Sequence, residues 1–220
     1  MLICGTVGNT PVRPGSMGKV IPHIPLSIID DTGKELPPGV EGNIAIRTSP
    51  RIPWMFDGYL KEDNSIFIPE ITDPTTGQRW YMTGDRARRD KDDYIWFVGR
   101  GDDVISTAGY RVGPFEIESC LKEHEGIVES AVVASPDSGR GEIVKAFIVL
   151  TSEYRKRDAV KLAKDIQDFV AQTTAPYKKP REVEFVDSLP KTVSGKIRHA
   201  ELRARERQKK AELIKKMAKL

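Results

Sequence analysis

The chain has 220 residues, of which 39% are hydrophobic and 30% are charged, the composition of an ordinary globular protein. These values exclude collagen-like and disordered chains, and no apolar run approaches the roughly 20 residues that a membrane-spanning helix needs. The formal net charge is +3, and residues 198–220 hold nine Lys and Arg against three Glu. We interpret this basic tail as a solvated helix. We expect no nucleic-acid partner, because no aromatic residue lies among the basic ones to stack on bases.

The first part of the chain, up to about residue 98, predicts a small β-rich unit. Short apolar runs at residues 26–29 and 43–47 are separated by turns that contain Pro and Gly. Aromatic and β-branched residues at 94–98 suit a half-buried strand. We therefore expect a strand at each of these three places.

After Gly99 the pattern changes to strands that alternate with helices. Pro114 fits a first helical turn, and the apolar residues after it have helical spacing. Pro176 ends a second helical pattern. The predicted elements are a helix at 114–124, strands at 128–134 and 143–150, a helix at 158–173, a strand at 183–186, a loop at 189–196 and the basic helix. The predicted fold class is α+β, with a boundary between residues 100 and 103.

Two short segments have residues suited to binding or catalysis. In residues 81–85 a small Thr-Gly step precedes Asp85, whose two acceptor oxygens suit a ribose diol; a plain turn is the alternative. In residues 189–196, Thr, Ser and Gly surround Lys196. This lysine can offer a point charge to an anion, or it can be an ordinary exposed lysine.

Three other kinds of site are disfavoured, because the sequence motifs that they require do not occur. Gly18-Lys19 and Gly195-Lys196 lack the Gly-x-x-x-x-Gly-Lys-Ser/Thr spacing of a phosphate-binding loop. The absence of a Gly-x-Ser-x-Gly elbow argues against a hydrolase. The three histidines lack metal-ligand spacing, so we expect no metal ligands in this chain and interpret His124 as a helix-end residue.

Four segments occur together and in order: YMTGD at 81–85, GRGDDVI at 99–105, GYRVGPFEIE at 109–118 and PKTVSGKI at 190–197. Together they resemble the C-terminal motifs of the AMP-forming acyl-CoA synthetases. These enzymes belong to the adenylate-forming, AMP-binding superfamily, with luciferases and peptide-synthetase adenylation domains. Residues 140–147 and 175–181 look most like the medium-chain acyl-CoA synthetase branch.

The resemblance implies a reaction in two steps, with rotation of the C-terminal domain between them. A carboxylate attacks the α-phosphate of ATP to give acyl-AMP and pyrophosphate, and the thiol of coenzyme A then displaces AMP. By resemblance, Asp85 accepts hydrogen bonds from the ribose hydroxyls and Arg100 helps to hold the nucleotide. Lys196 matches the catalytic lysine of the first step. In the family this lysine contacts ATP, and its positive charge stabilises the negative charge that develops. Arg111 matches an arginine that contacts the acyl substrate.

The same resemblance implies a hinge and a coenzyme A surface. Asp102 lies where the family has its hinge, although the adjacent Asp103 makes the assignment ambiguous by one position. Gly109 would allow close backbone approach to pantetheine. The expected coenzyme A residues are Ala108, Gly109, Tyr110, Arg140, Lys179, Pro180 and Arg181.

Two upstream motifs of the family do not occur in the sequence. One is the Ser/Thr/Gly-rich loop ending in Pro-Lys that wraps the ATP phosphates, and the other is Tyr-Gly-x-Thr-Glu, whose Thr and Glu contact phosphate and magnesium. We therefore expect the C-terminal part of a synthetase, unable to adenylate alone, with the Mg²⁺ ligands in the missing part. The expected domains are the C-terminal β subdomain of the AMP-binding domain at 1–99, a mobile α+β domain at 100–205 and a basic helical tail at 206–220.

The expected substrates are ATP, coenzyme A and a carboxylic acid, by resemblance a medium-chain fatty acid. A short, non-catalytic coenzyme A-binding or regulatory module is the alternative hypothesis. A luciferase-like or amino-acid-adenylating enzyme also stays open, since acyl specificity lies mostly upstream. Two cysteines and no signal-peptide pattern indicate an intracellular, soluble chain of the cytoplasm or the mitochondrial matrix. The sequence predicts no oligomeric state.

Overall fold

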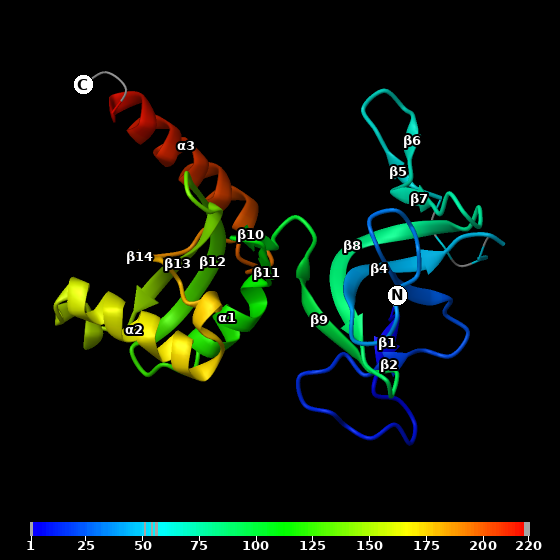
Figure 1. Cartoon of the computed structure of the whole chain (residues 1–220), viewed down its shortest axis with the longest axis horizontal. Coiled ribbons are helices and arrows are strands. Elements are labelled where there is room, and N and C mark those ends of the chain that lie inside the picture. The colour runs from blue at the N-terminus through cyan, green and yellow to red at the C-terminus, as the bar shows by residue number, and fades with distance from the viewer. Residues whose placement is uncertain (1, 51, 54, 56, 218–220) are drawn as a thin grey trace. The chain divides into compact units, whose positions relative to one another are not determined.

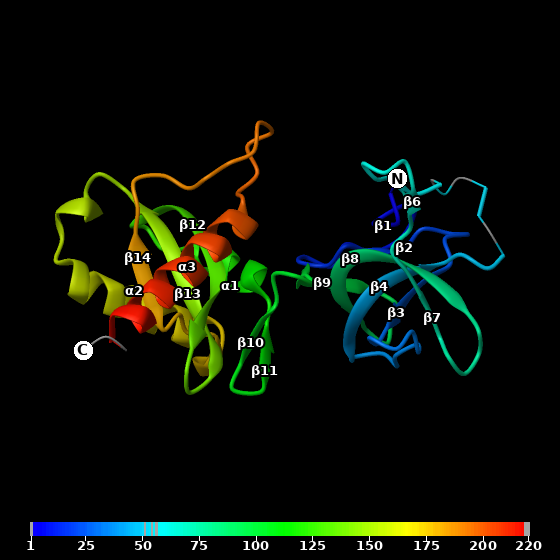
Figure 2. The ribbon, with the colours of Figure 1, turned by 90° about the horizontal axis from the view of Figure 1, so that it is seen from above.

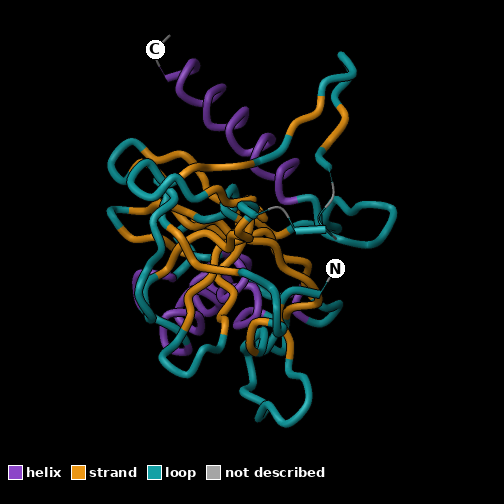
Figure 3. Tube along the Cα trace, turned by 90° about the vertical axis from the view of Figure 1, so that its right-hand side faces the viewer, coloured by secondary structure: helices purple, strands orange, loops and turns teal. Residues whose placement is uncertain are grey.

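The computed structural model describes residues 2–50, 52–53, 55 and 57–217. The chain divides into two compact units, of which the first ends at Asp102 and the second begins at Asp103 (Figure 1). Among the described residues, all helices lie in the second unit (Figure 3, purple). The first unit consists of strands and loops.

The first unit is built on one antiparallel sheet in which β8 (Arg79–Arg89) is the longest strand. One edge of β8 pairs with β4 (Glu41–Arg47), and the other pairs with β7 (Glu70–Thr72) and β9 (Ile95–Arg100). β3 (Leu26–Ile29) pairs with the free edge of β4. Two short pairs complete this unit: β1 (Cys4–Gly5) with β2 (Lys19–Val20), and β5 (Tyr59–Leu60) with β6 (Ile66–Phe67).

This sheet has a buried cluster on each of its two faces. Successive side chains of a strand point to opposite sides, so neighbouring residues belong to different clusters. Ile44 packs with Ile28 and Ile95 in one buried cluster. Its neighbour Ala45 packs with Trp80 in another. The strands predicted at 26–29, 43–47 and 94–98 are all found, with ends that differ by at most two residues.

The second unit has a five-stranded sheet with β13 (Gly141–Leu150) at its centre. β12 (Ile127–Asp137) pairs antiparallel along one edge of β13. At the other edge, β10 (Ile105–Thr107) meets the first residue of β13, and β14 (Glu182–Phe185) runs parallel to its middle. β11 (Tyr110–Val112) pairs with β10 and ends the sheet.

Three helices cover this sheet, two on one face and one on the other (Figure 2). Val132 and Val144 face the cluster that includes the first two helices, whereas Val133 faces Leu202 of the third. The helices are α1 (Pro114–Leu121), α2 (Ala159–Thr173) and α3 (His199–Met217), with short 3-10 turns η1 (Tyr154–Lys156) and η2 (Pro176–Lys178). The predicted α+β fold class is confirmed.

The local signals of the sequence account for where the helices begin. Pro114 is the first residue of α1. Asp158 caps α2, since its side chain accepts a hydrogen bond from the Lys161 amide at 2.8 Å. The helix α1 ends at Leu121 rather than near residue 124. Residue 206, where the tail was predicted to begin, lies inside the continuous helix α3.

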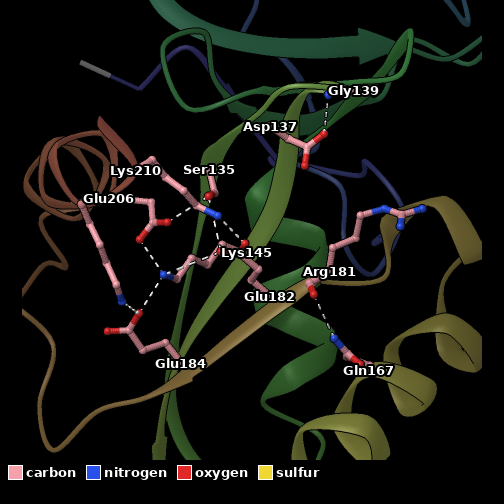
Figure 4. Close-up of polar contacts among 11 residues, drawn as sticks. Ser135, Asp137, Gly139, Lys145, Gln167, Arg181, Glu182, Glu184, Glu206 and Lys210 are labelled. Carbon is pink, nitrogen blue, oxygen red and sulfur yellow. Dashed lines mark hydrogen bonds and ion pairs between the residues drawn. The ribbon is translucent and has the colours of Figure 1, made fainter. Parts of the chain in front are cut away.

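Charged side chains are buried between α3 and the sheet (Figure 4). Lys145 of β13 is 3% exposed and Glu206 of α3 is 1% exposed, and Lys145 Nζ lies 2.5 Å from Glu206 Oε2. Lys145 Nζ also lies 2.7 Å from Glu184 Oε2 of β14. Ser135 Oγ donates to Glu206 Oε1 at 2.9 Å. Each buried charge therefore has an opposite partner, which compensates for its lost hydration.

Two further lysines of α3 extend these contacts. Lys209 Nζ lies 2.8 Å from Glu184, and Lys210 pairs with Glu182. Burial alone lowers the pKa of Lys145, but hydrogen bonds to Glu184 and Glu206 outweigh burial and raise it, so this lysine stays charged. The prediction of a simply solvated tail is therefore wrong for the first half of α3, which is fixed to the sheet by ion pairs.

Replacing Glu206 should strongly destabilise the second unit. Glu206→Ala removes the closest partner of the buried Lys145 but leaves Glu184 at 2.7 Å, so the expected loss is about 1.5–3 kcal/mol, that of a hydrogen bond to a charged group. Urea unfolding followed by circular dichroism in the helical band reports this unit, because it contains the described helices. The double variant Lys145→Met/Glu206→Leu removes both charges and is expected to recover most of the loss. A Glu206→Ala variant as stable as the parent would contradict this account.

Candidate functional site

Two predicted nucleotide residues lie opposite each other on neighbouring strands of the first unit. Asp85 of β8 pairs with Arg100 of β9, with Asp85 Oδ1 3.6 Å from Arg100 Nη1. Gly84 has a φ of +81° within β8. A Cβ there would lie 3.1 Å from Arg100 Nη2, so glycine leaves room for the guanidinium group. Residues 81–85 therefore belong to a strand, and the alternative of a plain turn is wrong.

The Asp85 carboxylate combines partial burial with access to solvent. Burial raises the pKa of Asp85, the charge of Arg100 lowers it, and the charge of Asp102 raises it, with a net rise. The side chain is 34% exposed. Its oxygens can therefore accept hydrogen bonds from hydroxyl groups of a ligand. Arg100 is shared between two carboxylates, because its Nε lies 3.4 Å from Asp102 Oδ1.

The two aspartates that compete for the hinge assignment belong to different units. Asp102 is the last residue of the first unit, and it contacts Arg100. Asp103 is the first residue of the second unit, and it pairs with Arg203 of α3; both of these side chains are largely buried. The transition between the two units thus lies at the peptide link from Asp102 to Asp103.

Three of the predicted coenzyme A residues lie at the tip of the β10–β11 hairpin. Thr107 pairs with Tyr110, so that Ala108 and Gly109 form a two-residue turn. Their φ values of +47° and +85° are both positive, as a type I′ turn requires. The Ala108 amide donates to the Arg140 carbonyl at 3.3 Å. This bond joins the hairpin tip to the turn between β12 and β13.

The turn between β12 and β13 is shaped by Asp137. Its Oδ1 accepts hydrogen bonds from the amides of Gly139 at 3.0 Å (Figure 4) and Arg140 at 2.9 Å. This local bonding is typical of Asp in turns, and it is available because the amides of a tight turn lack strand partners. The turn leaves Arg140 exposed.

A groove of about 560 Å³ in the second unit gathers five of the seven predicted coenzyme A residues. These five come from the β10–β11 hairpin, the β12–β13 turn and the segment before β14. The lining residues are Thr107, Tyr110, Arg140, Gln167, Pro176, Tyr177, Lys179, Pro180 and Arg181.

The segment at 179–181 is fixed to the sheet by its backbone. The Arg181 amide donates to the Val144 carbonyl at 2.8 Å. Gln167 Nε2 of α2 donates to the Arg181 carbonyl at 3.3 Å (Figure 4). Pro180 is buried. The backbone of Arg181 is thus held while its side chain stays exposed.

Two tyrosines form an exposed aromatic surface in the groove. The rings of Tyr110 and Tyr177 are stacked, with centroids 4.6 Å apart and planes inclined by 17°. They are 55% and 44% exposed. Lys178 Nζ lies 5.5 Å from the Tyr177 ring centroid. A planar ligand can stack on such a surface.

The cations of the groove differ in their partners. Lys179 Nζ lies 2.5 Å from Asp168 Oδ1, and this contact holds the pKa of Asp168 below its usual value. Within the part of the chain that the structure describes, no carboxylate lies within 4.0 Å of the guanidinium groups of Arg140 and Arg181. These two groups carry uncompensated positive charge, which suits a ligand with phosphate groups.

Lys196 lies at the tip of an exposed loop between β14 and α3, residues 190–198, which we call the lysine loop. The Thr192 amide donates to the Lys196 carbonyl at 2.8 Å, and the Lys196 amide donates to Thr192 Oγ1 at 3.1 Å. Gly195 has a φ of +82°. The tip is therefore an ordered turn. No carboxylate among the described residues lies within 4.0 Å of Lys196 Nζ.

The predicted residues and the groove lining do not coincide fully, because the predicted coenzyme A residues Ala108 and Gly109 do not line the groove. Arg111 is exposed on β11 and does not line the groove. Tyr177 and Gln167 line it and were not predicted. A signal for Tyr177 was available, because an aromatic residue precedes two lysines in the segment 175–181. None existed for Gln167, whose contact depends on the packing of α2.

The described residues also bear on metal binding and on membrane-spanning helices. Among residues 2–50, 52–53, 55 and 57–217, no three His, Cys, Asp or Glu side chains are grouped so as to hold a metal ion. None of the described helices is long and apolar enough to cross a membrane.

The chain is similar in sequence to known proteins of one kind. Residues 116–196 match the AMP-binding enzyme C-terminal domain. The chain is 52% identical over 207 residues to mitochondrial acyl-coenzyme A synthetase ACSM3 of Mus musculus, covering 94% of this chain and 35% of that protein. It is 51% identical over 207 residues to mitochondrial acyl-coenzyme A synthetase ACSM5 of Homo sapiens, with the same coverage.

Solved structures give the same result. A structure of the anthranilate CoA ligase AuaEII in complex with anthranoyl-AMP matches with a TM-score of 0.71 and 36% identity, covering 91% of this chain and 36% of that chain. ATP-bound MatB from Rhodopseudomonas palustris matches with a TM-score of 0.68 and 32% identity, covering 87% of this chain and 35% of that chain.

The fold and these matches define the second unit as the C-terminal domain of an AMP-binding, adenylate-forming enzyme. Within that class, the chain is similar to the C-terminal part of acyl-coenzyme A synthetases, in agreement with the family predicted from the four motifs. The chain spans about a third of the length of the curated relatives it matches, 35% for the mouse protein.

The hairpin turn at residues 108–109 gives a test of this geometry. Ala108→Gly should stabilise the second unit by about 0.5–1 kcal/mol, because glycine adopts a positive φ without the steric cost of a Cβ. Gly109→Ala should destabilise it by about 1 kcal/mol for the same reason. Urea unfolding measures both. Since a Cβ at 109 would meet no atom within 4 Å, a loss on Gly109→Ala reports backbone strain and not a clash.

Proposed function

We propose that this chain supplies the coenzyme A-binding and lysine-bearing part of an acyl-CoA synthetase. Such an enzyme activates a carboxylic acid with ATP to acyl-AMP and transfers the acyl group to coenzyme A. The observation that carries the proposal is the groove in which the stacked Tyr110 and Tyr177 adjoin the unpaired guanidinium groups of Arg140 and Arg181. Coenzyme A has a planar adenine and several phosphates, which match these two surfaces.

In the first step, charge builds on the oxygens around the α-phosphate as the carboxylate attacks. Lys196 has no acidic partner among the described residues, so its ammonium group is available to stabilise that charge. Asp85 accepts hydrogen bonds from the ribose hydroxyls, which orients the nucleotide. Arg100, beside Asp85, contributes a positive charge toward the same nucleotide.

In the second step, the thiol of coenzyme A attacks the acyl carbonyl and AMP leaves. The groove holds the nucleotide end of coenzyme A, and the Ala108-Gly109 turn lets the pantetheine arm pass close to the backbone. Arg111 contacts the acyl substrate. The link at Asp102 and Asp103 acts as the hinge between the two steps, since it joins residues that belong to separate units.

The relatives support the remaining parts of the proposal. The two relatives named above are acyl-coenzyme A synthetases described as mitochondrial, so we place this chain in the mitochondrial matrix, acting on a medium-chain fatty acid. Ligands for Mg²⁺ would come from outside the described residues. Small molecules are the partners, and nucleic acid is not among them.

A coenzyme A-binding module without catalysis is the second candidate. It is favoured by one observation: the groove is formed entirely by residues of the second unit. Both candidates predict coenzyme A binding. They differ in whether the chain can complete a synthetase, which the second of the following experiments decides.

The isolated chain should bind coenzyme A. Arg140→Ala and Arg181→Ala should each weaken binding by about tenfold, because each removes a charged hydrogen-bond donor to phosphate. Titration calorimetry measures the affinity. Arg207→Ala is the matched control, since Arg207 is an exposed arginine of α3 outside the groove and its loss should leave affinity unchanged. Equal effects of all three variants would attribute binding to general positive charge.

Lys196 should act in the first step only. In a chimera, this chain replaces the 207 matching residues of mouse ACSM3. Lys196→Ala should lower acyl-AMP formation by about 100-fold, since it removes a group that stabilises developing charge. Thioester formation from supplied acyl-AMP should change by less than threefold. Lys156→Ala is the control, an exposed lysine at η1.

Two outcomes of the chimera experiment would contradict the proposal. Equal losses in both steps would refute a role of Lys196 confined to adenylation. A chimera that binds coenzyme A but forms no acyl-AMP even with Lys196 present would favour the non-catalytic module.

A further inference from the structure

The lysine loop has two ends that are fixed to the rest of the second unit. We call residues 190–191 its first leg and residues 197–198 its second leg. Lys191 and Ile197 form a β-bridge, and the Arg198 amide donates to the Pro190 carbonyl at 2.9 Å. Ile197 packs against the buried cluster that contains Leu189. The residues at the tip are exposed, whereas the legs are tied to each other and to the core. The position of Lys196 therefore depends on what fixes the legs.

One carboxylate connects the residue that follows the second leg, His199, to α1 and β12. Glu118 of α1 is largely buried, with its side chain 14% exposed. Its Oε1 accepts a hydrogen bond from the Val132 amide of β12 at 2.8 Å. The same oxygen lies 2.7 Å from Nε2 of His199, which is the first residue of α3 and follows Lys196 by three positions. Glu118 thus joins α1, β12 and the first residue of α3, which directly follows the lysine loop.

A second carboxylate contacts the first leg. Lys191 Nζ lies 2.5 Å from Glu129 Oε1 of β12, but these side chains are 40% and 37% exposed. Exposed ion pairs contribute little because water screens them. The contact made by Glu118 is more buried and includes a hydrogen bond to the backbone. Glu118 is therefore the stronger of the two anchors.

We propose that Glu118 is a positioning residue for Lys196. The tip of the lysine loop is an ordered turn, so a shift at His199 moves Lys196 with it instead of being absorbed by the loop. A displacement of about 1 Å in a catalytic group can cost on the order of a hundredfold in rate. The inference rests on the proposed function of Lys196 in acyl-AMP formation. It assigns to Glu118 a role through another residue, without contact to substrate.

The first test uses the chain itself and follows hydrogen exchange of the amides of Thr192 and Arg198. Glu118→Ala should lower their protection about tenfold, while the amides in the middle of β13 keep theirs. Glu118→Gln can still accept from the Val132 amide and should retain most of the protection. Glu123→Gln, an exposed glutamate just beyond α1, is the control and should change nothing. Unchanged loop protection in Glu118→Ala would overturn the proposal.

The second test uses the chimera with mouse ACSM3. Glu118→Ala should lower the rate constant of acyl-AMP formation about tenfold with KM values for ATP and acid within twofold, and should leave thioester formation from supplied acyl-AMP within twofold. Glu118→Gln should restore most of the first rate. Equal loss in both steps would show that Glu118 supports only the fold, and would overturn the proposal.

Lys196→Ala, measured in parallel, separates the two levels of the argument. If Lys196→Ala leaves acyl-AMP formation unchanged, the proposed function itself fails. If Lys196→Ala abolishes that step and Glu118→Ala does not affect it, the proposed function stands and only the positioning role of Glu118 is refuted.

Discussion

The antiparallel pairing of β12 with β13 is the constraint on which the second unit depends. The pairing runs from Ile127 opposite Leu150 to Asp137 opposite Gly141, and both faces of these strands are covered by helices. A shift of register by one residue would turn every side chain to the wrong face. The turn at its end presents Arg140, and the backbone of β13 holds the segment of Arg181. The groove is therefore placed by one strand pair.

The charged residue in the middle of this strand pair explains why α3 packs where it does. Lys145 lies among apolar residues on the face toward α3, and an apolar residue of similar size would often be at least as stable. A buried lysine that Glu184 of β14 already contacts, however, favours a helix that brings it a second carboxylate. Glu206 provides it, and Ser135 holds its second oxygen. We infer that this preference helps to set how α3 lies on the sheet, and with it the position of His199, the residue directly after the lysine loop.

The sequence predicts features that depend on neighbouring residues, and it misses features that depend on residues far apart in the chain. Pro114 and Asp158 mark helix starts by local steric and capping effects, whereas the two-residue turn at 108–109 was not predicted. Asp85 was identified from its neighbours, but its place inside the long strand β8 depends on pairing with β4 and β9. The partner of Lys145 on α3 lies 61 positions away, and His199 lies 81 positions from Glu118. No local pattern predicts such contacts.

The division of the chain between Asp102 and Asp103 affects the two proposed steps differently. All residues of the groove belong to the second unit, so its shape is complete whatever the state of the link. Asp85 and Arg100 belong to the first unit, whereas Lys196 belongs to the second. Under the proposed function, orientation of the nucleotide and stabilisation of developing charge therefore rest on residues of different units, which the link from Asp102 to Asp103 joins. The proposed function therefore predicts that affinity for coenzyme A belongs to one folded unit, whereas acyl-AMP formation requires both, and that small errors in the placement of Lys196 affect only the latter.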